Sequence, residues 1–263
     1  MSRREPFPDE ELRRRIMDFI MAAGQTLLEN GAEVFRVEQT MEIMAKSFHL
    51  REFHVYVLTN GIFASAGTAE ISEVRNVPSR TTHLGRVAAV NALSREIAQT
   101  DMTLDEAESR LVLARRIPFP KDWVQLVSGM CGAFSFAMIF GGTLREGLAA
   151  AVAGLAANWY LLLCEQHDLP GGFKKISCAA LITLVCILVC NLLRSAASHA
   201  IIGALMILTP GIAFTMGIRD FVHGDYLSGT IRMIDALLVA ASIAIGTGLV
   251  LSLYTLTTGV TVA

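Results

Sequence analysis

The sequence Thr209-Pro210-Gly211, with its helix-breaking proline, interrupts a long apolar stretch towards the C-terminal end of the chain. Proline removes a backbone donor from a helix, and its ring crowds the carbonyl four residues earlier, here that of Met206. In a bilayer, backbone groups freed in this way are stable only where protein covers them or where they line a polar cavity. The break therefore predicts either a simple kink or a discontinuous helix of the kind that forms polar solute sites within a membrane.

Ionisable and amide side chains near this break could take part in the same chemistry. Arg219 and Asp220 follow the break, and Asp235 stands just before the last apolar stretch. Charged groups in or beside membrane segments are costly and often functional, so either aspartate could carry a proton. The alternative is that these charges only fix the topology of the chain. Asn158 and Asn191 lie within other apolar stretches and are further candidates for polar groups along a path for a hydrophilic solute.

The motifs of three common enzyme classes are missing from the sequence. There is no Gly-x-x-x-x-Gly-Lys phosphate loop, no His-Glu-x-x-His zinc motif and no Gly-x-Ser-x-Gly elbow. We therefore expect a protein that is not an enzyme, with no metal site and no cofactor, although coupling to protons fits the aspartates. The net charge of −2 also argues against nucleic acid as a partner.

The elements that must hold these residues are apolar helices. Five stretches after residue 122 contain no Asp, Glu, Lys or Arg, and a helix needs roughly 20 apolar residues to cross the hydrocarbon core of a lipid bilayer. One such stretch could be a buried helix of a soluble protein, but five in series indicate an all-α membrane domain over residues 122–263. The expected spans lie near residues 123–141, 147–164, 176–193, 198–218 and 233–256.

The first part of the chain has the composition of a soluble domain, since residues 1–122 hold 16 of the 22 basic and 18 of the 24 acidic residues. Apolar residues follow the helical period up to Gly31 and again from Val34, and they alternate from Glu52 to Leu58 as in a strand. Weaker strand patterns and two more helices follow. We expect a small α+β domain over residues 1–117, joined to the membrane domain by a proline-containing linker at residues 118–121.

The charges around this first domain predict its side of the membrane. The N-terminus is strongly charged and has no apolar segment of a signal peptide behind it. Arg110, Arg115, Arg116 and Lys121 precede the first expected span, as is typical of a cytoplasmic flank. We therefore expect a multi-pass protein of the cell membrane whose N-terminus lies in the cytoplasm.

Small residues recur every four positions on the last expected span, at Ala236, Ala240, Ala244 and Gly248. Small side chains on one face let membrane helices approach each other closely. This ridge predicts packing within the chain, and the alternative is that another membrane subunit docks on it.

Several motifs along the chain are similar, in their order and spacing, to those of the N-terminal half of the threonine/serine exporter family. That half also occurs as the separate, larger subunit of a split exporter. The residues that carry the resemblance include Glu33, Arg36, Glu38, Asn91 and Arg95 in the first domain, and Thr209-Pro210-Gly211 with Arg219-Asp220 in the membrane domain.

The resemblance implies a subunit of a secondary active exporter in a prokaryotic inner membrane. Its small-molecule substrate would be a small hydrophilic metabolite, either threonine or serine, or a dicarboxylate such as succinate. It also implies a second, smaller membrane subunit that resembles the C-terminal half of the family, and assembly with further copies of this chain is a related expectation. The alternative from another class is a membrane-anchored sensor whose cytoplasmic domain binds a ligand or a protein.

Overall fold

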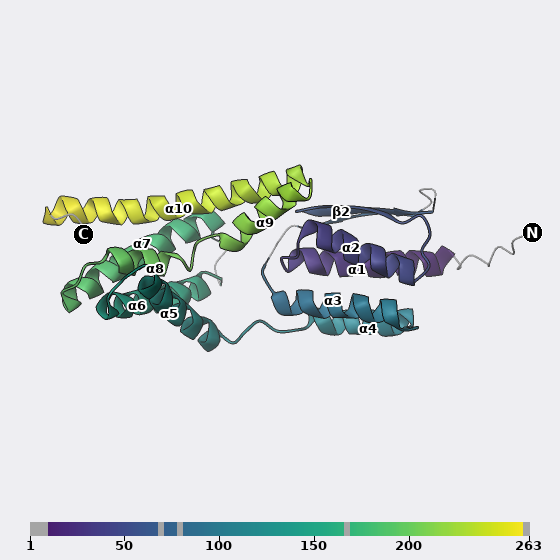
Figure 1. The fold of residues 1–263 in the computed structure, drawn as a ribbon, viewed down its shortest axis with the longest axis horizontal. Coiled ribbons are helices and arrows are strands. Elements are labelled where there is room, and N and C mark those ends of the chain that lie inside the picture. Colours follow the sequence, from purple (N-terminus) through teal and green to yellow (C-terminus); the bar gives the residue numbers. More distant parts are fainter. Residues whose placement is uncertain (1–9, 68–70, 78–80, 166–168, 260–263) are drawn as a thin grey trace, which may run out of the picture. The chain divides into compact units, whose positions relative to one another are not determined.

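The computed structural model describes residues 10–67, 71–77, 81–165 and 169–259, which are mostly helical with one small sheet (Figure 1). The chain divides into two compact units. The first contains Met1–Phe119 together with Met216–Arg232, and the second contains Pro120–Thr215 together with Met233–Ala263. The mostly helical class with a small sheet agrees with the sequence, whereas the domain boundaries at residues 117 and 122 stay predictions.

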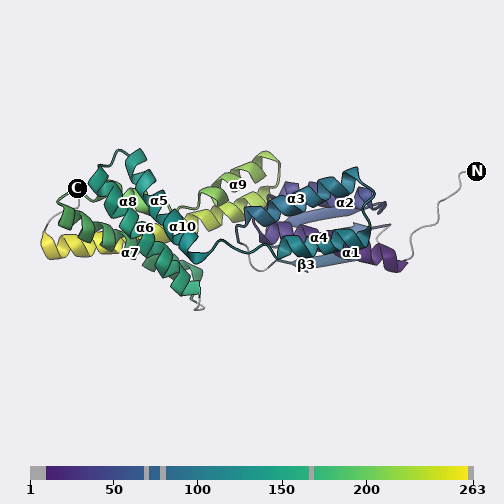
Figure 2. The same ribbon diagram turned by 90° about the horizontal axis from the view of Figure 1, so that it is seen from below.

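The first unit is built in three layers (Figures 1 and 2). Helices α1 and α2 lie between the antiparallel sheet, of order β1-β2-β3, and the helix pair α3 and α4. In chain order these elements are α1 (Glu10–Glu29), α2 (Val34–Ser47), β1 (His54–Leu58), β2 (Gly61–Ala66), β3 (Ile71–Asn76), α3 (Leu84–Gln99) and α4 (Leu104–Arg115).

The core of the first unit follows from the helical period of its sequence. Met17 and Ile20 of α1 and Met41 of α2 are fully buried. The two helices meet closely at Gly24, where an added Cβ would lie 2.3 Å from the sulfur of Met41. Gly31 has a φ of +87°, a left-handed conformation that favours glycine, and it ends the turn after α1 so that α2 can begin.

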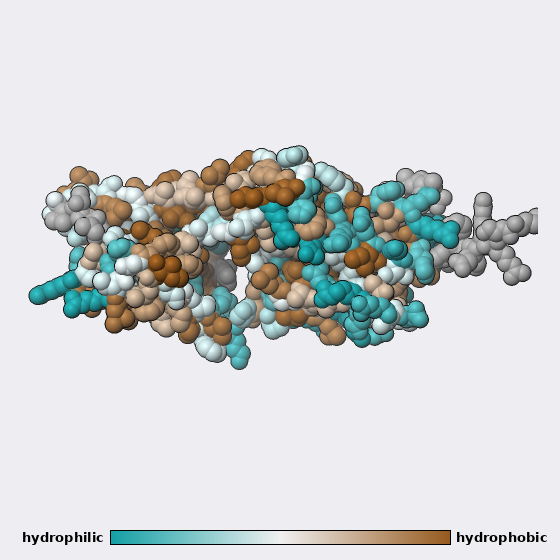
Figure 3. All heavy atoms as spheres, in the orientation of Figure 1, coloured by the Kyte–Doolittle hydropathy of each residue, from teal (hydrophilic) through white to brown (hydrophobic). Residues whose placement is uncertain are grey.

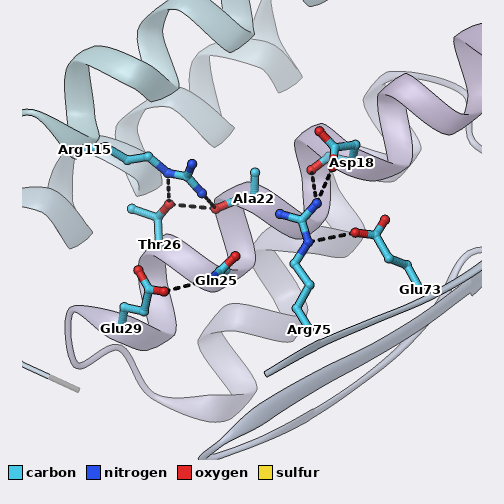
Figure 4. Close-up of polar contacts among 8 residues, drawn as sticks. All are labelled: Asp18, Ala22, Gln25, Thr26, Glu29, Glu73, Arg75 and Arg115. Carbon is cyan, nitrogen blue, oxygen red and sulfur yellow. Dashed lines mark hydrogen bonds and ion pairs between the residues drawn. The ribbon is translucent and has the colours of Figure 1, made fainter. Parts of the chain in front are cut away.

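Two arginines connect α1 to the layers on either side of it (Figure 4). Arg115 of α4 donates from Nε to the hydroxyl of Thr26, 2.7 Å away. Arg75 of β3 contacts Asp18 of α1 and donates to Glu73 of its own strand at 2.7 Å. The Arg75 side chain is only 18% exposed, so these contacts fix the sheet against the helix.

The second unit consists of apolar helices whose surfaces are strongly hydrophobic (Figure 3). In chain order the remaining helices are α5 (Asp122–Ile139), α6 (Leu144–Glu165), α7 (Gly171–Leu193), α8 (Ser198–Leu205), α9 (Gly211–Val222) and α10 (Tyr226–Thr258). Glycines bring them together. A Cβ at Gly154 of α6 would lie 2.5 Å from the carbonyl oxygen of Gly129 in α5, and one at Gly203 of α8 would lie 2.4 Å from the backbone nitrogen of Ala137 in α5.

The apolar stretch at residues 198–218 is divided in two, as the position of Pro210 predicts. It forms α8, with 8 residues, and the first part of α9, which has 12. Neither is long enough to cross a bilayer alone. Among the described residues, four helices have the length and composition of a membrane span, namely α5, α6, α7 and α10, so the count of five spans stays a prediction.

The expected small-residue ridge is not the face of α10 that packs most closely within the second unit. Ala236 is buried, but Ala240 and Ala244 are exposed, and a Cβ at Gly248 would have no atom within 4 Å. The close approach is at Gly246, where a Cβ would lie 2.2 Å from the carbonyl oxygen of Ile176 in α7. Residues two apart on a helix point in nearly opposite directions, so the ridge around Ala244 is left open.

Candidate functional site

The first unit contains a groove of about 400 Å³ between α2, α3 and α9. Five residues that the sequence singled out line this groove, although they come from three distant parts of the chain. They are Glu33, Arg36, Asn91, Arg95 and Arg219. The remaining lining residues are Gly31, Ala32, Gln39, Thr40, Ile43, Leu84, Val87, Ser94 and Met216.

Helical spacing brings the groove side chains of α2 and α3 to facing surfaces. Arg36 and Thr40 are four residues apart on α2, and Asn91 and Arg95 are four apart on α3, so each pair shares a helix face. The Thr40 hydroxyl lies 2.7 Å from the carbonyl oxygen of Arg36 and 3.3 Å from the side-chain oxygen of Asn91. The first contact is internal to α2, and the second joins α2 to α3 at the groove.

Arg219 of α9 lines the groove together with residues of α2 and α3. Its Nη1 lies 2.6 Å from Oε1 of Glu33, the residue that precedes α2, and the Glu33 side chain is 17% exposed. The Arg219 guanidinium also lies 5.4 Å from the centre of the Phe35 ring, on which His223 stacks at 4.3 Å. A charge pair and aromatic contacts therefore hold this part of α9 against the start of α2.

A second ion pair, between Asp220 of α9 and Arg232 of α10, lies beside the groove. Arg232 Nε is 2.9 Å from Asp220 Oδ2, in a close ion pair that is not well aligned as a hydrogen bond. Arg232 Nη2 also donates to the carbonyl oxygen of Ala32 at 3.3 Å. Burial raises the pKa of Asp220, and the positive charge of Arg232 opposes this rise. The negative charges of Asp225 and Glu33 add to the rise.

Glu38 of α2, another predicted motif residue, faces the sheet rather than the groove. Its Oε1 accepts a hydrogen bond of 2.8 Å from the backbone N–H of Val57 in β1. Burial raises the pKa of Glu38, the hydrogen bond from Val57 opposes the rise, and the negative charges of Asp225 and Glu42 contribute to it. This carboxylate joins α2 to the edge of the sheet.

The helix break lies in the second unit and has the geometry that proline imposes. Because Pro210 has no N–H, the carbonyl of Met206 accepts instead from the Thr209 N–H at 3.3 Å, three residues away. The Thr209 side chain is exposed, and its hydroxyl donates to the carbonyl of Leu205 at 3.3 Å. The break at Thr209-Pro210-Gly211 thus belongs to the second unit, whereas the groove that contains Arg219 belongs to the first.

Three other predicted path residues belong to the second unit and are part of neither the groove lining nor the helix break. Asn158 of α6 donates to the carbonyl oxygen of Gln125 in α5 at 2.6 Å, which is a contact that holds two helices together. Asn191 is exposed on α7, 3.4 Å from the hydroxyl of Tyr254. Asp235 lies on an exposed face of α10. A role for these three residues in a transport path stays a prediction.

A buried charged residue that the sequence analysis missed is Glu146, at the start of α6. It is 3% exposed, accepts from the backbone N–H of Thr143 at 2.5 Å, and lies 3.2 Å from Nδ1 of His199 in α8. The Thr-x-x-Glu spacing is that of a capping box, so the local sequence was enough to predict the contact between Glu146 and Thr143. The contact with His199 joins residues 53 positions apart and had no local signal.

Comparison with known proteins gives one family and one relative. The model of the threonine/serine exporter family, ThrE, matches residues 18–254. The chain is 23% identical over 262 residues to the probable threonine/serine exporter of Mycobacterium tuberculosis, a match that covers 93% of this chain and 49% of that protein. The chain thus spans about half the length of this curated relative. No solved structure matches the chain.

Proposed function

The chain belongs to the threonine/serine exporter family, and from this premise we propose that it is a subunit of a secondary active exporter of threonine or serine. The matched residues include both the groove and the helix break, so the resemblance found in the motifs is confirmed over most of the chain. A small dicarboxylate such as succinate is the other candidate substrate. The membrane concerned is the cytoplasmic membrane, with the first unit on the cytoplasmic side.

The single structural observation that carries the proposal is the interruption between α8 and α9. A helix that only anchors a protein in the membrane is expected to be continuous, because a continuous helix forms all of its backbone hydrogen bonds internally. Here, α8 packs against α5 so closely that Gly203 has no room for a Cβ. The helix ends at Leu205, and only turns closed by hydrogen bonds between residues three apart continue to Thr209. Thr209 and Gly211 are exposed at this interruption, and many transporters bind a polar solute at helix interruptions within the membrane.

We also propose that further membrane helices complete the path. The relative from Mycobacterium tuberculosis is about twice as long as the matched region, so helices equivalent to its other half would come from a second polypeptide or from a longer version of this one. The ridge of Ala240, Ala244 and Gly248, which is open on α10, is a surface on which such helices could pack. Further copies of this chain are the other occupants to be tested.

Proton coupling is the mode of energy use that the ionisable residues support best. Asp220 is held by Arg232 in a buried pair, and protonation of Asp220 would neutralise one partner and weaken the contact. Asp235, on the exposed face of α10, is the second candidate. An Asp235→Asn variant that exports normally at every pH would leave Asp220 as the remaining candidate of the two.

The direct test is metabolite efflux in cells that lack or overproduce this chain together with a partner encoded nearby. We expect overproduction to lower the internal concentration of threonine or serine and to raise the external one, and we expect the deletion to do the reverse. Succinate is measured in the same samples. If none of the three metabolites changes in either strain, the chain is not part of an exporter for them.

A substitution at the break tests the structural part of the proposal. Pro210→Ala restores a backbone donor and favours a continuous helix, so we expect export to fall while the amount of protein in the membrane is unchanged. Pro170→Ala, at the exposed N-terminal cap of α7, is the matched control and should export normally. Equal export by both variants would show that the break is only a kink.

A further inference from the structure

The groove of the first unit contains cationic groups that the protein itself does not use. Arg36 and Arg95 are exposed at its rim, and within the described part of the chain neither guanidinium makes a hydrogen bond or an ion pair. Arg36 lies only against the ring of Phe35, at 5.4 Å. Guanidinium groups bind carboxylates through paired hydrogen bonds, so two of them at one groove supply the chemistry of a carboxylate site.

Two residues that line the same groove, Glu33 and Ser94, also have buried polar atoms without partners. The hydroxyl of Ser94 is buried, with a residue exposure of 2%, and has no hydrogen-bond partner among the described residues. Oε2 of Glu33 is likewise buried and has no hydrogen bond, because Arg219 engages only Oε1. A buried polar atom without a partner is costly, and a ligand that supplies the partner offsets that cost.

We propose that this groove binds a small zwitterion with one carboxylate and one ammonium group, that is, a free amino acid with a small polar side chain. The carboxylate lies at Arg36 and Arg95, and on binding the side chains of Glu33 and Ser94 turn their unpaired oxygens to the ammonium group and to a hydroxyl of the ligand. The volume of about 400 Å³ is within the range of small-molecule sites. A dicarboxylate fits less well, because its second carboxylate would face the negative charge of Glu33.

The site differs from the helix break at which we place the passage of substrate, and it deepens the proposed function on which its ligand class rests. Arg219 belongs to both the groove and α9, and it shares the Glu33 carboxylate with the ligand ammonium. A bound zwitterion therefore adds contacts to the pair that holds α9 against α2. The groove thus reports the amino-acid concentration on its own side of the membrane to the helix that follows the break.

The test is equilibrium binding of radiolabelled L-threonine, L-serine and succinate to the purified full chain in lipid nanodiscs. We expect saturable binding of the two amino acids and weaker binding of succinate. Arg36→Gln and Arg95→Gln should each weaken amino-acid binding by about tenfold or more, the usual value of a charged hydrogen bond. Arg116→Gln, an exposed arginine at the end of α4, is the matched control and should bind as the unmodified chain does.

Two further readouts separate binding in the groove from a general effect on folding. Glu33→Gln should weaken binding of the amino acids and bring the affinity for succinate closer to theirs, because the repelling charge is removed. Amino-acid binding should also slow hydrogen exchange in peptides from α9 in the unmodified chain, and should do so less in Arg95→Gln. All three variants carry their changes at the groove and should keep the helical content of the unmodified chain.

The inference is overturned by absence of saturable amino-acid binding, by tighter binding of succinate, or by equal binding in Arg36→Gln, Arg95→Gln and Arg116→Gln. Equal binding would place the amino acid outside the groove.

Failure of this inference can be told apart from failure of the proposed function. If cells export threonine but the groove variants bind it normally, only the proposal that the groove is the binding site is refuted. If binding depends on the groove but cells export none of the three metabolites, only the proposed export function is refuted.

Discussion

Loss of the ion pair between Asp220 and Arg232 should loosen α9 from the rest of the first unit. The two side chains are 1% and 8% exposed, so water provides little compensation when one partner is removed. At a separation of 2.9 Å and an effective dielectric constant of about 20, their attraction is about 6 kcal/mol before the cost of desolvation. Removing one partner from a buried pair typically costs about 3–5 kcal/mol, because the other charge stays buried.

The substitution Asp220→Asn should lie at the lower end of that range, since the asparagine oxygen can still accept from Arg232. A loss of about 3 kcal/mol of stability corresponds to an increase of roughly a hundredfold in the population of molecules in which α9 has detached from the first unit. Hydrogen exchange, measured by mass spectrometry on the full chain in nanodiscs, reports this opening directly. We expect peptides from α9 and from the turn at Ala32 to exchange about a hundred times faster, whereas peptides from α6 should not change.

Asp101→Asn, an exposed aspartate in the same unit, is the matched control and should leave exchange unchanged. The double variant Asp220→Asn with Arg232→Met should recover part of the loss, because it leaves no buried charge alone. If Asp220→Asn exchanges no faster in α9 than Asp101→Asn, the ion pair does not hold this helix, and the reasoning from burial is wrong.

The remaining predictions concern a buried carboxylate and a helix contact. Burial raises the pKa of Glu38 above its ordinary value of 4.5, so the folded state binds this proton more tightly than the unfolded state. The stability that Glu38 contributes is therefore greatest below pH 4.5 and is lost as the pH rises through the folded-state pKa. In Glu38→Gln the amide oxygen can still accept from the Val57 N–H. Scanning fluorimetry should show a higher Tm for this variant at pH 7 and a smaller fall of the Tm with rising pH. A Tm below that of the unmodified chain at pH 7 would contradict this. Gly246→Leu should lower the stability of the folded chain by about 1–3 kcal/mol, because the side chain overlaps the backbone at Ile176, and should lower the Tm in detergent. The side chain of Gly248→Leu points into open space, so this control should leave the Tm unchanged. Equal Tm values for the two variants would mean that α10 does not approach α7 at Gly246.

Local sequence patterns were enough to predict most of the helices and strands of the first unit. The turn at Gly31 and the alternation at Val55 and Val57 each depend on neighbours within a few residues. The break at Pro210 was predictable for the same reason, because proline acts on its own turn.

The groove could not be assembled from such local signals. The contact between Arg219 and Glu33 joins residues 186 positions apart, and the sequence placed Arg219 with the membrane domain. The role of the ridge on α10 was also undetermined, because Ala244 and Gly246 are both small and only the position of α7 decides which one is covered. Contacts of this kind depend on the packing of whole elements, which helical periodicity does not contain.

The central claim, that this chain takes part in export of threonine or serine, is tested most directly by transport into and out of vesicles. The purified chain, alone and together with the proposed partner subunit, would be reconstituted into liposomes loaded with labelled threonine, with an imposed proton gradient. The account predicts that release exceeds that of protein-free vesicles, depends on the proton gradient, and falls in Pro210→Ala. Release equal to that of protein-free vesicles for threonine, serine and succinate, with both proteins correctly inserted, would contradict it.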